Sequence, residues 1–239
     1  MRFISDFVDM ASMYETIMNF PLFKGIGGAQ VSEFLAKTNV QFKNYKDGDI
    51  VIEENEDCTH LKFIVAGNVR TYMSNMSLSL TISELRTSGT VLSPEYLFGI
   101  ETKYPYKAIA VGSVSIMQFR KDEYLKLLQT NTIYMLNYLN YLSWHSQRPI
   151  QALRLVNDGS LKEILAQWLL AMTGNESVNI RIIGKIEDVS KATNIEEKKL
   201  RESLSELRNK GILDYDNSLI RIHSRRELID TVIKDFENL

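Results

Sequence analysis

The sequence predicts an α+β protein with short antiparallel strands in its first half, a long helix in the middle and two short helices near its end. Three observations carry this prediction. Short apolar runs alternate with turns between Val40 and Phe119, apolar residues recur at helical spacing from Lys121 to Asn157, and two helical faces separated by a break occupy Lys185 to Leu213. A period of two indicates strands, whereas spacings of three and four indicate one buried face of a helix.

Composition is typical of a globular protein. The 239 residues are 44% hydrophobic and 24% charged. No apolar run reaches the roughly 20 residues that span a bilayer, and Asp6 lies where a signal peptide would be apolar. We therefore expect a cytoplasmic protein with no membrane partner. Cys58 is the single cysteine, which excludes an intrachain disulfide and four-cysteine iron–sulfur ligation within one chain.

The first half has the texture of an antiparallel sandwich or barrel. Its apolar runs are separated by turn sequences at Lys46 to Asp49, Glu54 to Asp57 and Ser88-Gly89. Many short strands at regular spacing predict this class of fold.

The middle of the chain, Lys121 to Asn157, predicts a helix with an apolar and aromatic stripe wider than one intramolecular contact requires. An exposed stripe of this size favours association, so we expect a two-fold dimer through this segment. Pro149 predicts a kink or an interruption near His145.

The two helical faces near the end of the chain indicate a helix-turn-helix. The second face consists of Leu200, Leu204 and Leu207, and Gly211 follows it as a C-cap. Asn194 falls between the two faces, where its tolerance of a left-handed backbone suits a turn. Two short helices joined in this way fit the motif.

Strand-like runs flank the two helices. Val178 to Ile182 alternates upstream, and Ile212 to Tyr215 and Leu219 to Ile222 enclose a hairpin turn at Asp216-Asn217-Ser218. A strand, two helices and a hairpin form the order of a winged helix.

The whole order of motifs resembles the CRP/FNR (cyclic-AMP receptor protein) family of bacterial transcription regulators. The resemblance rests on Pro21-Leu22-Phe23, Lys46 to Asp49, Phe63 to Val69 and the winged helix, and it covers nearly the whole chain. It implies a cyclic-nucleotide-binding-type β-roll with N-terminal helices over residues 1–120, a dimerisation helix over 121–157, and a winged helix-turn-helix DNA-binding domain over 158–239. It also implies a homodimer on a pseudo-palindromic operator in double-stranded DNA, and contact with RNA polymerase.

The resemblance places the DNA contact on the second helix of the pair. Glu197 to Glu202 correspond to the run that touches the operator, although Glu197 and Glu202 occupy the two positions where the family has arginine. A different operator sequence is therefore expected. The predicted DNA-binding residues are Lys198, Lys199, Arg201, Glu197, Glu202 and Arg221.

A second interpretation stays open, because glutamates interleave with these cations and the net charge is −2. In that interpretation the β-roll binds a ligand or a protein, and the winged helix mediates protein contacts.

The nucleotide-binding members of the family hold the ribose with a Gly-Glu pair and the phosphate with an Arg-Ser pair. Here Ser93-Pro94 stand at the first place, and Tyr106 and Lys107 at the second. Pro94 also removes a backbone N–H. Glu95, Tyr106 and Lys107 are the candidates for a degenerate effector site. We expect that cyclic AMP does not regulate the protein and that the roll holds an unknown small-molecule effector or none, with these possible lining residues for an apolar or mixed ligand: Tyr72, Phe98, Tyr104 and Tyr106.

Sequence patterns that carry catalysis are missing. The chain has no GxxxxGK[ST], HExxH or GxSxG motif. His60, His145 and His223 lack metal-ligand spacing, so we expect no metal or cofactor, a haem held by His60 or His145 being the less favoured alternative. The sequence therefore predicts a regulator rather than an enzyme.

Overall fold

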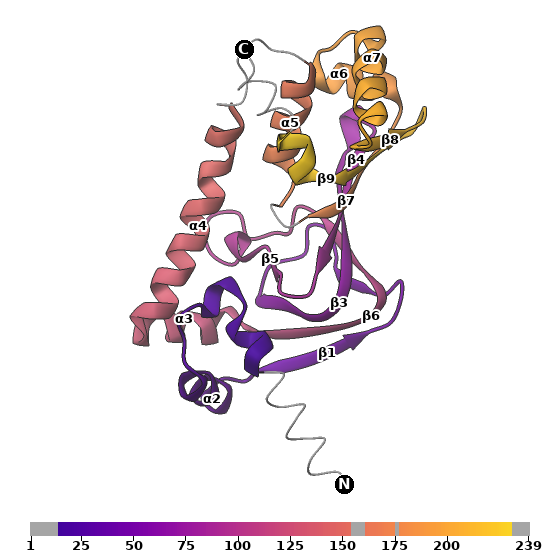
Figure 1. Cartoon of the computed structure of the whole chain (residues 1–239). Coiled ribbons are helices and arrows are strands. Elements are labelled where there is room, and N and C mark those ends of the chain that lie inside the picture. Colours follow the sequence, from indigo (N-terminus) through magenta and orange to yellow (C-terminus); the bar gives the residue numbers. More distant parts are fainter. Residues whose placement is uncertain (1–13, 154–160, 175–176, 231–239) are drawn as a thin grey trace. The chain divides into compact units, whose positions relative to one another are not determined.

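The computed structural model describes residues 14–153, 161–174 and 177–230, which form two compact units (Figure 1). The first unit extends to Val69 and resumes from Thr87 to His145, and the second combines Arg70–Arg86 with the chain from Ser146 onward. Residues 1–13 of the predicted N-terminal domain and 154–157 of the predicted dimerisation helix lie outside the described residues.

The first unit is built from antiparallel strands with helices before and after them. β6 pairs with β1 through Phe42 and Met117 and also with β2, while β5 pairs with β3 through Lys62 and Leu92. Its elements are η1 (Pro21–Phe23), α2 (Gly28–Lys37), β1 (Gln41–Tyr45), β2 (Ile50–Ile52), β3 (His60–Asn75), β5 (Val91–Leu92), η3 (Pro94–Tyr96), β6 (Lys107–Arg120), α3 (Lys121–Thr130) and α4 (Thr132–Leu153), of which β3 and α4 continue into the second unit. The short antiparallel strands agree with the prediction.

Aromatic rings form the core of the first unit. The Phe63 ring lies 4.8 Å from that of Phe20 and 5.6 Å from that of Phe119. Tyr134 meets Phe23 edge to face at 5.5 Å. Such offset and edge-to-face pairs contribute stability beyond the area that they bury. The core therefore joins the Pro21–Phe23 turn to β3, β6 and α4.

The helical segment in the middle of the chain is divided at Asn131. The Asn131 Oδ1 atom accepts a hydrogen bond from the backbone N–H of Ile133 at 2.9 Å, which caps the start of α4. α4 then continues to Leu153, so the helix is not interrupted at Pro149. Asn137 secures α4 by donating hydrogen bonds to the backbone oxygens of Leu22 and Lys24.

The second unit is an antiparallel sheet in which the end of β3 is followed by four further strands, with helices on one face (Figure 1). Ile82 of β4 lies opposite Ile182 of β7, which in turn lies opposite Ile220 of β9. These isoleucines share a core with residues of α5, α6 and α7. The elements are η2 (Met76–Leu78), β4 (Leu80–Thr87), α5 (Leu161–Met172), β7 (Val178–Ile183), α6 (Ile186–Thr193), α7 (Glu197–Asn209), β8 (Leu213–Tyr215) and β9 (Leu219–Ser224), and the strand order is β4-β7-β9-β8.

A buried carboxylate fastens the β3–β4 hairpin to the C-terminal part of this unit. Glu84 is 7% exposed and accepts hydrogen bonds from the Gly174 backbone N–H at 3.0 Å and from the Ser177 hydroxyl. Its other oxygen forms an ion pair with Arg86. A buried carboxylate needs such partners, because an unpaired one would be strongly unfavourable. The hairpin is thus held by strand pairing and by charge.

Helices that could cross a membrane are not found in the described ranges, since none of their helices is both long and apolar enough.

A substitution at Gly67, which lies within the Phe63 to Val69 motif, would test how closely β3 approaches β6. It has φ +83°, and a Cβ there would lie 2.2 Å from the backbone oxygen of Ser113. Gly48 has the same φ with nothing within 4 Å of its Cβ position. We expect Gly48→Ala to cost about 1 kcal/mol of unfolding free energy for backbone strain, and Gly67→Ala roughly 2 kcal/mol more for the clash.

Urea denaturation of both variants measures the difference. Equal destabilisation by the two substitutions would show that the backbone conformation alone, rather than the contact with β6, requires glycine at position 67.

Candidate nucleic-acid interface and effector pocket

The α6–α7 pair has a tight connection that the sequence explains. α6 ends at Asn194, whose φ of 55° and ψ of 36° are left-handed, and α7 begins at Glu197. Asparagine adopts this conformation at lower cost than most residues. The Ser190 hydroxyl donates to the backbone oxygen of Ile195 and closes the turn.

The core of the second unit determines which face of α7 is exposed. Leu200, Leu204 and Leu207 are fully buried among isoleucines of β7 and β9. Residues between these positions must then point away from the sheet, because a helix turns about 100° per residue. Lys198 and Lys199 are exposed accordingly, as is Glu202.

The cations of α7 differ in their surroundings. Within the described residues, neither Lys198 nor Lys199 forms an ion pair. Arg201 instead donates from Nε to the Glu197 carboxylate at 2.9 Å and from Nη1 to the Asn217 side-chain oxygen at 3.2 Å. The structure thus brings Glu197 and Arg201 together with the turn of the β8–β9 hairpin, and it leaves the two lysines open to solvent.

Further polar contacts fix α7 against the β8–β9 hairpin. The Ser205 and Tyr215 hydroxyls lie 2.7 Å apart. Asp214 forms an ion pair with Arg208 at 3.8 Å, and its carboxylate lies 3.2 Å from Nε2 of His223. In the turn, Asp216 accepts from the backbone N–H of Ser218, and this bond lowers the pKa of its carboxyl group. The hairpin is evident in the sequence, but the side-chain contacts that join residues 6 to 10 positions apart are not, because their pairing follows from the fold.

Arg221 lies apart from the α7 lysines. It is exposed between Ile220 and Ile222, which are buried in the core beneath α6 and α7. Since successive strand residues point to opposite faces, the Arg221 side chain lies on the face of the sheet away from the helices. Its cross-strand neighbours are Arg181 and Asp214.

The sequence analysis did not single out two other arginines near Arg221. Arg181 lies directly opposite Arg221, and Arg70 donates to the Ser83 hydroxyl and to the backbone oxygen of Asn179, each at 3.2 Å. Burial lowers the pKa of Arg70, and the positive charges of Arg181 and Arg221 lower it further. This face of the sheet therefore carries a second positive region, separate from α7.

In the first unit, the predicted effector residues are tied to the protein itself. Ser93 has φ 42°, and its hydroxyl lies 2.7 Å from that of Tyr106, which is 9% exposed. Lys107 forms an ion pair with Glu53 at 3.4 Å. Glu95 lies in η3 with one carboxylate oxygen buried. Burial raises the pKa of Tyr138, and the negative charge of Glu95 raises it further.

Aromatic side chains occupy the surroundings of η3. The Tyr138 hydroxyl donates to the backbone oxygen of Pro94 at 2.9 Å, and the Tyr138 ring meets Phe98 edge to face at 5.9 Å. The Tyr104 and Tyr106 rings lie 6.1 Å apart. Of the four side chains predicted to line a ligand site, Phe98, Tyr104 and Tyr106 belong to the first unit, whereas Tyr72 belongs to the second.

Groups of three or more metal-ligating side chains are not found within the described ranges. Cys58 is buried, and burial raises the pKa of its thiol. Its Sγ lies 3.8 Å from the backbone oxygen of His60, so the thiol is sequestered within the fold.

Comparison with known proteins gives one family match and several similar structures. Residues 42–131 match the family model described as the cyclic nucleotide-binding domain. A search of curated proteins finds no significant match.

The catabolite activator protein of Thermus thermophilus aligns over 90% of this chain and 99% of its own, with 16% identity and a TM-score of 0.52. The sensor domain of the transcriptional regulator DNR from Pseudomonas aeruginosa aligns over 57% of this chain and 90% of its own, with 22% identity and a TM-score of 0.50. A CRP/FNR-family transcriptional regulator of Thermus thermophilus aligns over 81% and 98%, with 16% identity and a TM-score of 0.43.

The family match extends from β1 to the end of α3, and the match to the catabolite activator protein extends over most of the chain. The resemblance stated from the sequence is thereby confirmed at the level of fold: residues 42–131 match a cyclic nucleotide-binding domain, and the chain has a fold similar to that of a bacterial catabolite activator protein.

Proposed function

We propose that this protein is a transcription regulator of the CRP/FNR type that binds double-stranded DNA through α7, acts as a homodimer and is not controlled by cyclic AMP. The observation that carries the proposal is the exposed start of α7, where Lys198 and Lys199 have no ion-pair partner within the described residues. Contact with RNA polymerase rests on the resemblance alone and stays a prediction.

The geometry of α7 suits a recognition helix. Its three buried leucines and its bonds to the β8–β9 turn hold it rigidly, while the first turn faces solvent. In helix-turn-helix proteins, the N-terminal residues of the second helix contact DNA in the major groove. Lys198 and Lys199 are placed for phosphate contacts, which supply most of the affinity for a negatively charged duplex.

In this proposal, the exposed carboxylate of Glu202 on α7 provides the selectivity for a DNA sequence. Glu202 is exposed, and within the described ranges it forms no ion pair. A carboxylate in the major groove accepts a hydrogen bond from the amino group of cytosine. Arg201 is already bound by Glu197 and Asn217, so its part is to orient Glu197 and the turn rather than to read a base.

Apolar side chains on the outer face of α4 support a homodimer. They are between 38% and 50% exposed and comprise Ile133, Met135, Leu136, Leu139 and Trp144. Tyr134 and Tyr138 on the same helix are buried in the first unit, so the exposed residues form a separate face. An exposed apolar face of this extent favours association. A two-fold dimer through it would require half-sites about one helical turn, ~34 Å, apart.

The aromatic surroundings of η3 argue against a cyclic nucleotide. A cyclic phosphate carries a full negative charge and needs a hydrogen-bonded cation when it is buried. The Tyr106 hydroxyl is engaged by Ser93, Lys107 by Glu53, and Pro94 offers no backbone N–H. The predicted effector residues therefore lack a free donor set for a phosphate.

The first prediction concerns the α7 lysines. Lys198→Ala/Lys199→Ala should weaken binding to a selected duplex by roughly ten- to one-hundred-fold, because two charge-assisted hydrogen bonds to phosphates are lost. It should also reduce the salt slope by about 0.9 for each contact. Fluorescence anisotropy at several salt concentrations measures both quantities after a binding-site selection from random duplexes.

Lys103→Ala/Lys121→Ala, two exposed lysines of the first unit, makes the same change in net charge and is the matched control. Arg221→Ala should have a smaller effect than the α7 variant because it lies on the other face of its sheet. An unchanged affinity and slope in the α7 variant would exclude α7 as the DNA-binding helix.

The second prediction concerns the dimer. Leu139→Glu places a charge on the apolar face of α4 and should raise the dimer dissociation constant at least about tenfold, since an unpaired charge is costly to bury. Sedimentation velocity at micromolar concentration measures it. Ala29→Glu, on an exposed position of α2 and away from this face, should sediment like the original protein. A monomeric original protein would contradict the proposal.

The third prediction concerns cyclic nucleotides. Calorimetry with cyclic AMP and cyclic GMP should show no binding at micromolar concentrations. If either nucleotide bound with a micromolar dissociation constant that was lost in Lys107→Ala but kept in Lys103→Ala, the degenerate site would be functional and the proposal would be wrong on this point.

A further inference from the structure

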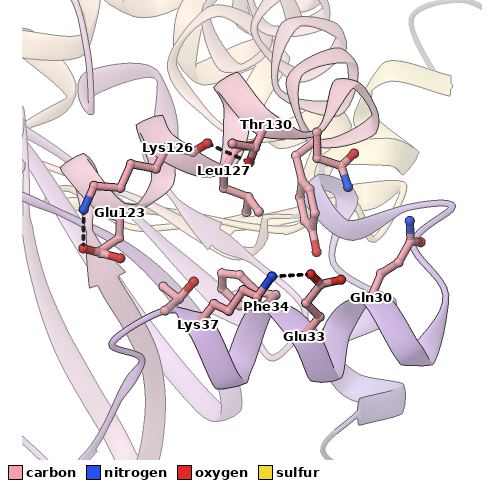
Figure 2. A pocket seen from close by; sticks show the side chains of 11 residues that line it. Gln30, Glu33, Phe34, Lys37, Glu123, Lys126, Leu127 and Thr130 are labelled. Carbon is pink, nitrogen blue, oxygen red and sulfur yellow. Dashed lines mark hydrogen bonds and ion pairs between the residues drawn. The ribbon is translucent and has the colours of Figure 1, made fainter.

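A pocket of about 450 Å³ lies in the first unit between α2 and the segment that joins α3 to α4 (Figure 2). Its size falls within the range of small-molecule sites in proteins. It is separate from the predicted effector residues, because neither Glu95, Tyr106 nor Lys107 lines it. Its lining includes Glu33, Phe34, Lys37, Glu123, Lys126, Leu127 and Tyr134.

The buried part of the pocket combines apolar surface with one unsatisfied polar group. Phe34 is 3% exposed and Tyr134 is 1% exposed, and both line the pocket. The Tyr134 hydroxyl oxygen is buried, and none of the residues that the structure describes forms a hydrogen bond with it. Leaving such a group unpaired costs on the order of 1–3 kcal/mol, so a group of this kind in a native structure requires an explanation.

The Tyr134 hydroxyl is a neutral donor. Burial and then the negative charge of Glu33 raise the pKa of Tyr134 to about 12. Glu33 and Tyr134 both line the pocket. The group can therefore donate a hydrogen bond to a molecule that enters.

The outer part of the pocket is balanced in charge. Figure 2 shows two ion pairs facing each other across it: Lys37 with Glu33 on α2, at 2.6 Å, and Lys126 with Glu123 on α3, at 3.2 Å. Each lysine is already paired with a carboxylate, so the rim offers no excess charge to an ion. An anion next to Tyr134 would also be repelled by Glu33.

We infer that this pocket binds an uncharged, mainly apolar small molecule whose carbonyl group accepts a hydrogen bond from the Tyr134 hydroxyl. The apolar part of such a molecule would pack on Phe34 and Leu127, both of which line the pocket. Because Tyr134 lies in the first turn of α4, the bound molecule would contact the start of that helix. The inference stands independently of the proposed DNA binding.

Three small molecules test whether the pocket selects an apolar ring, a carbonyl acceptor or a negative charge. Acetophenone has an aromatic ring and a carbonyl acceptor, toluene has the ring alone, and benzoate adds a negative charge. For a ligand of this size we expect a dissociation constant of about 1 mM for acetophenone. Titrations followed by two-dimensional NMR should show weaker binding of toluene and benzoate, with amide shifts concentrated in α2 and at Leu127 to Tyr134.

The decisive variant is Tyr134→Phe, which removes only the hydroxyl. It should weaken acetophenone binding about three- to tenfold, the value of one neutral hydrogen bond, and leave toluene binding unchanged. Tyr124→Phe is the matched control, because the Tyr124 hydroxyl is also buried without a partner but Tyr124 does not line the pocket. Both variants should melt at or above the temperature of the original protein, since neither loses a hydrogen bond.

Several results would overturn the inference. One is the absence of acetophenone binding at about 10 mM, roughly the weakest affinity expected for nine non-hydrogen atoms. Others are equal affinity for acetophenone and toluene in the original protein, or a preference for acetophenone that Tyr134→Phe keeps. A clear fall in melting temperature for Tyr134→Phe alone would show that an internal water already satisfies the hydroxyl.

Discussion

The pairing of β4 with β7 is the contact on which the second unit depends. It joins the Arg70–Arg86 hairpin to strands that lie about a hundred residues later in the chain, with Ile82 opposite Ile182. Leu80 and Ile82 then enter the same core as Leu200 and Leu204 of α7. Glu84 adds hydrogen bonds to Gly174 and Ser177, so the pairing is fixed in register as well as in position. A slip of one residue would turn the isoleucines outward and Ser83 inward.

Strand β3 is shared by the two units. The strand contributes Phe63 to the aromatic core of the first unit, and its last residues, from Arg70, form the hairpin of the second. One continuous strand therefore belongs to both units.

Tyrosine hydroxyls distinguish two regions of the first unit. Near η3, the hydroxyls of Tyr106 and Tyr138 are satisfied by Ser93 and Pro94, and the region is held together by its own groups. Near the start of α4, the Tyr134 hydroxyl is buried with no hydrogen-bond partner in the described part of the chain, and Tyr134 lines a pocket. Satisfied polar groups stabilise a closed structure, whereas an unsatisfied one favours a ligand.

The sequence by itself determined the features that depend on near neighbours. Apolar spacing located α7 and its buried leucines, Asn194 and Asp216 marked the turns, and the order of motifs identified the fold. The tertiary structure alone decided that the β3–β4 hairpin pairs with β7, that Arg201 is bound to Asn217, that Arg221 lies on the other face of its sheet from α7, and that Tyr134 lines a pocket. The reason is physical: periodicity reports which face of an element is buried, but the register between distant strands and the partners of long side chains depend on the packing of the whole unit.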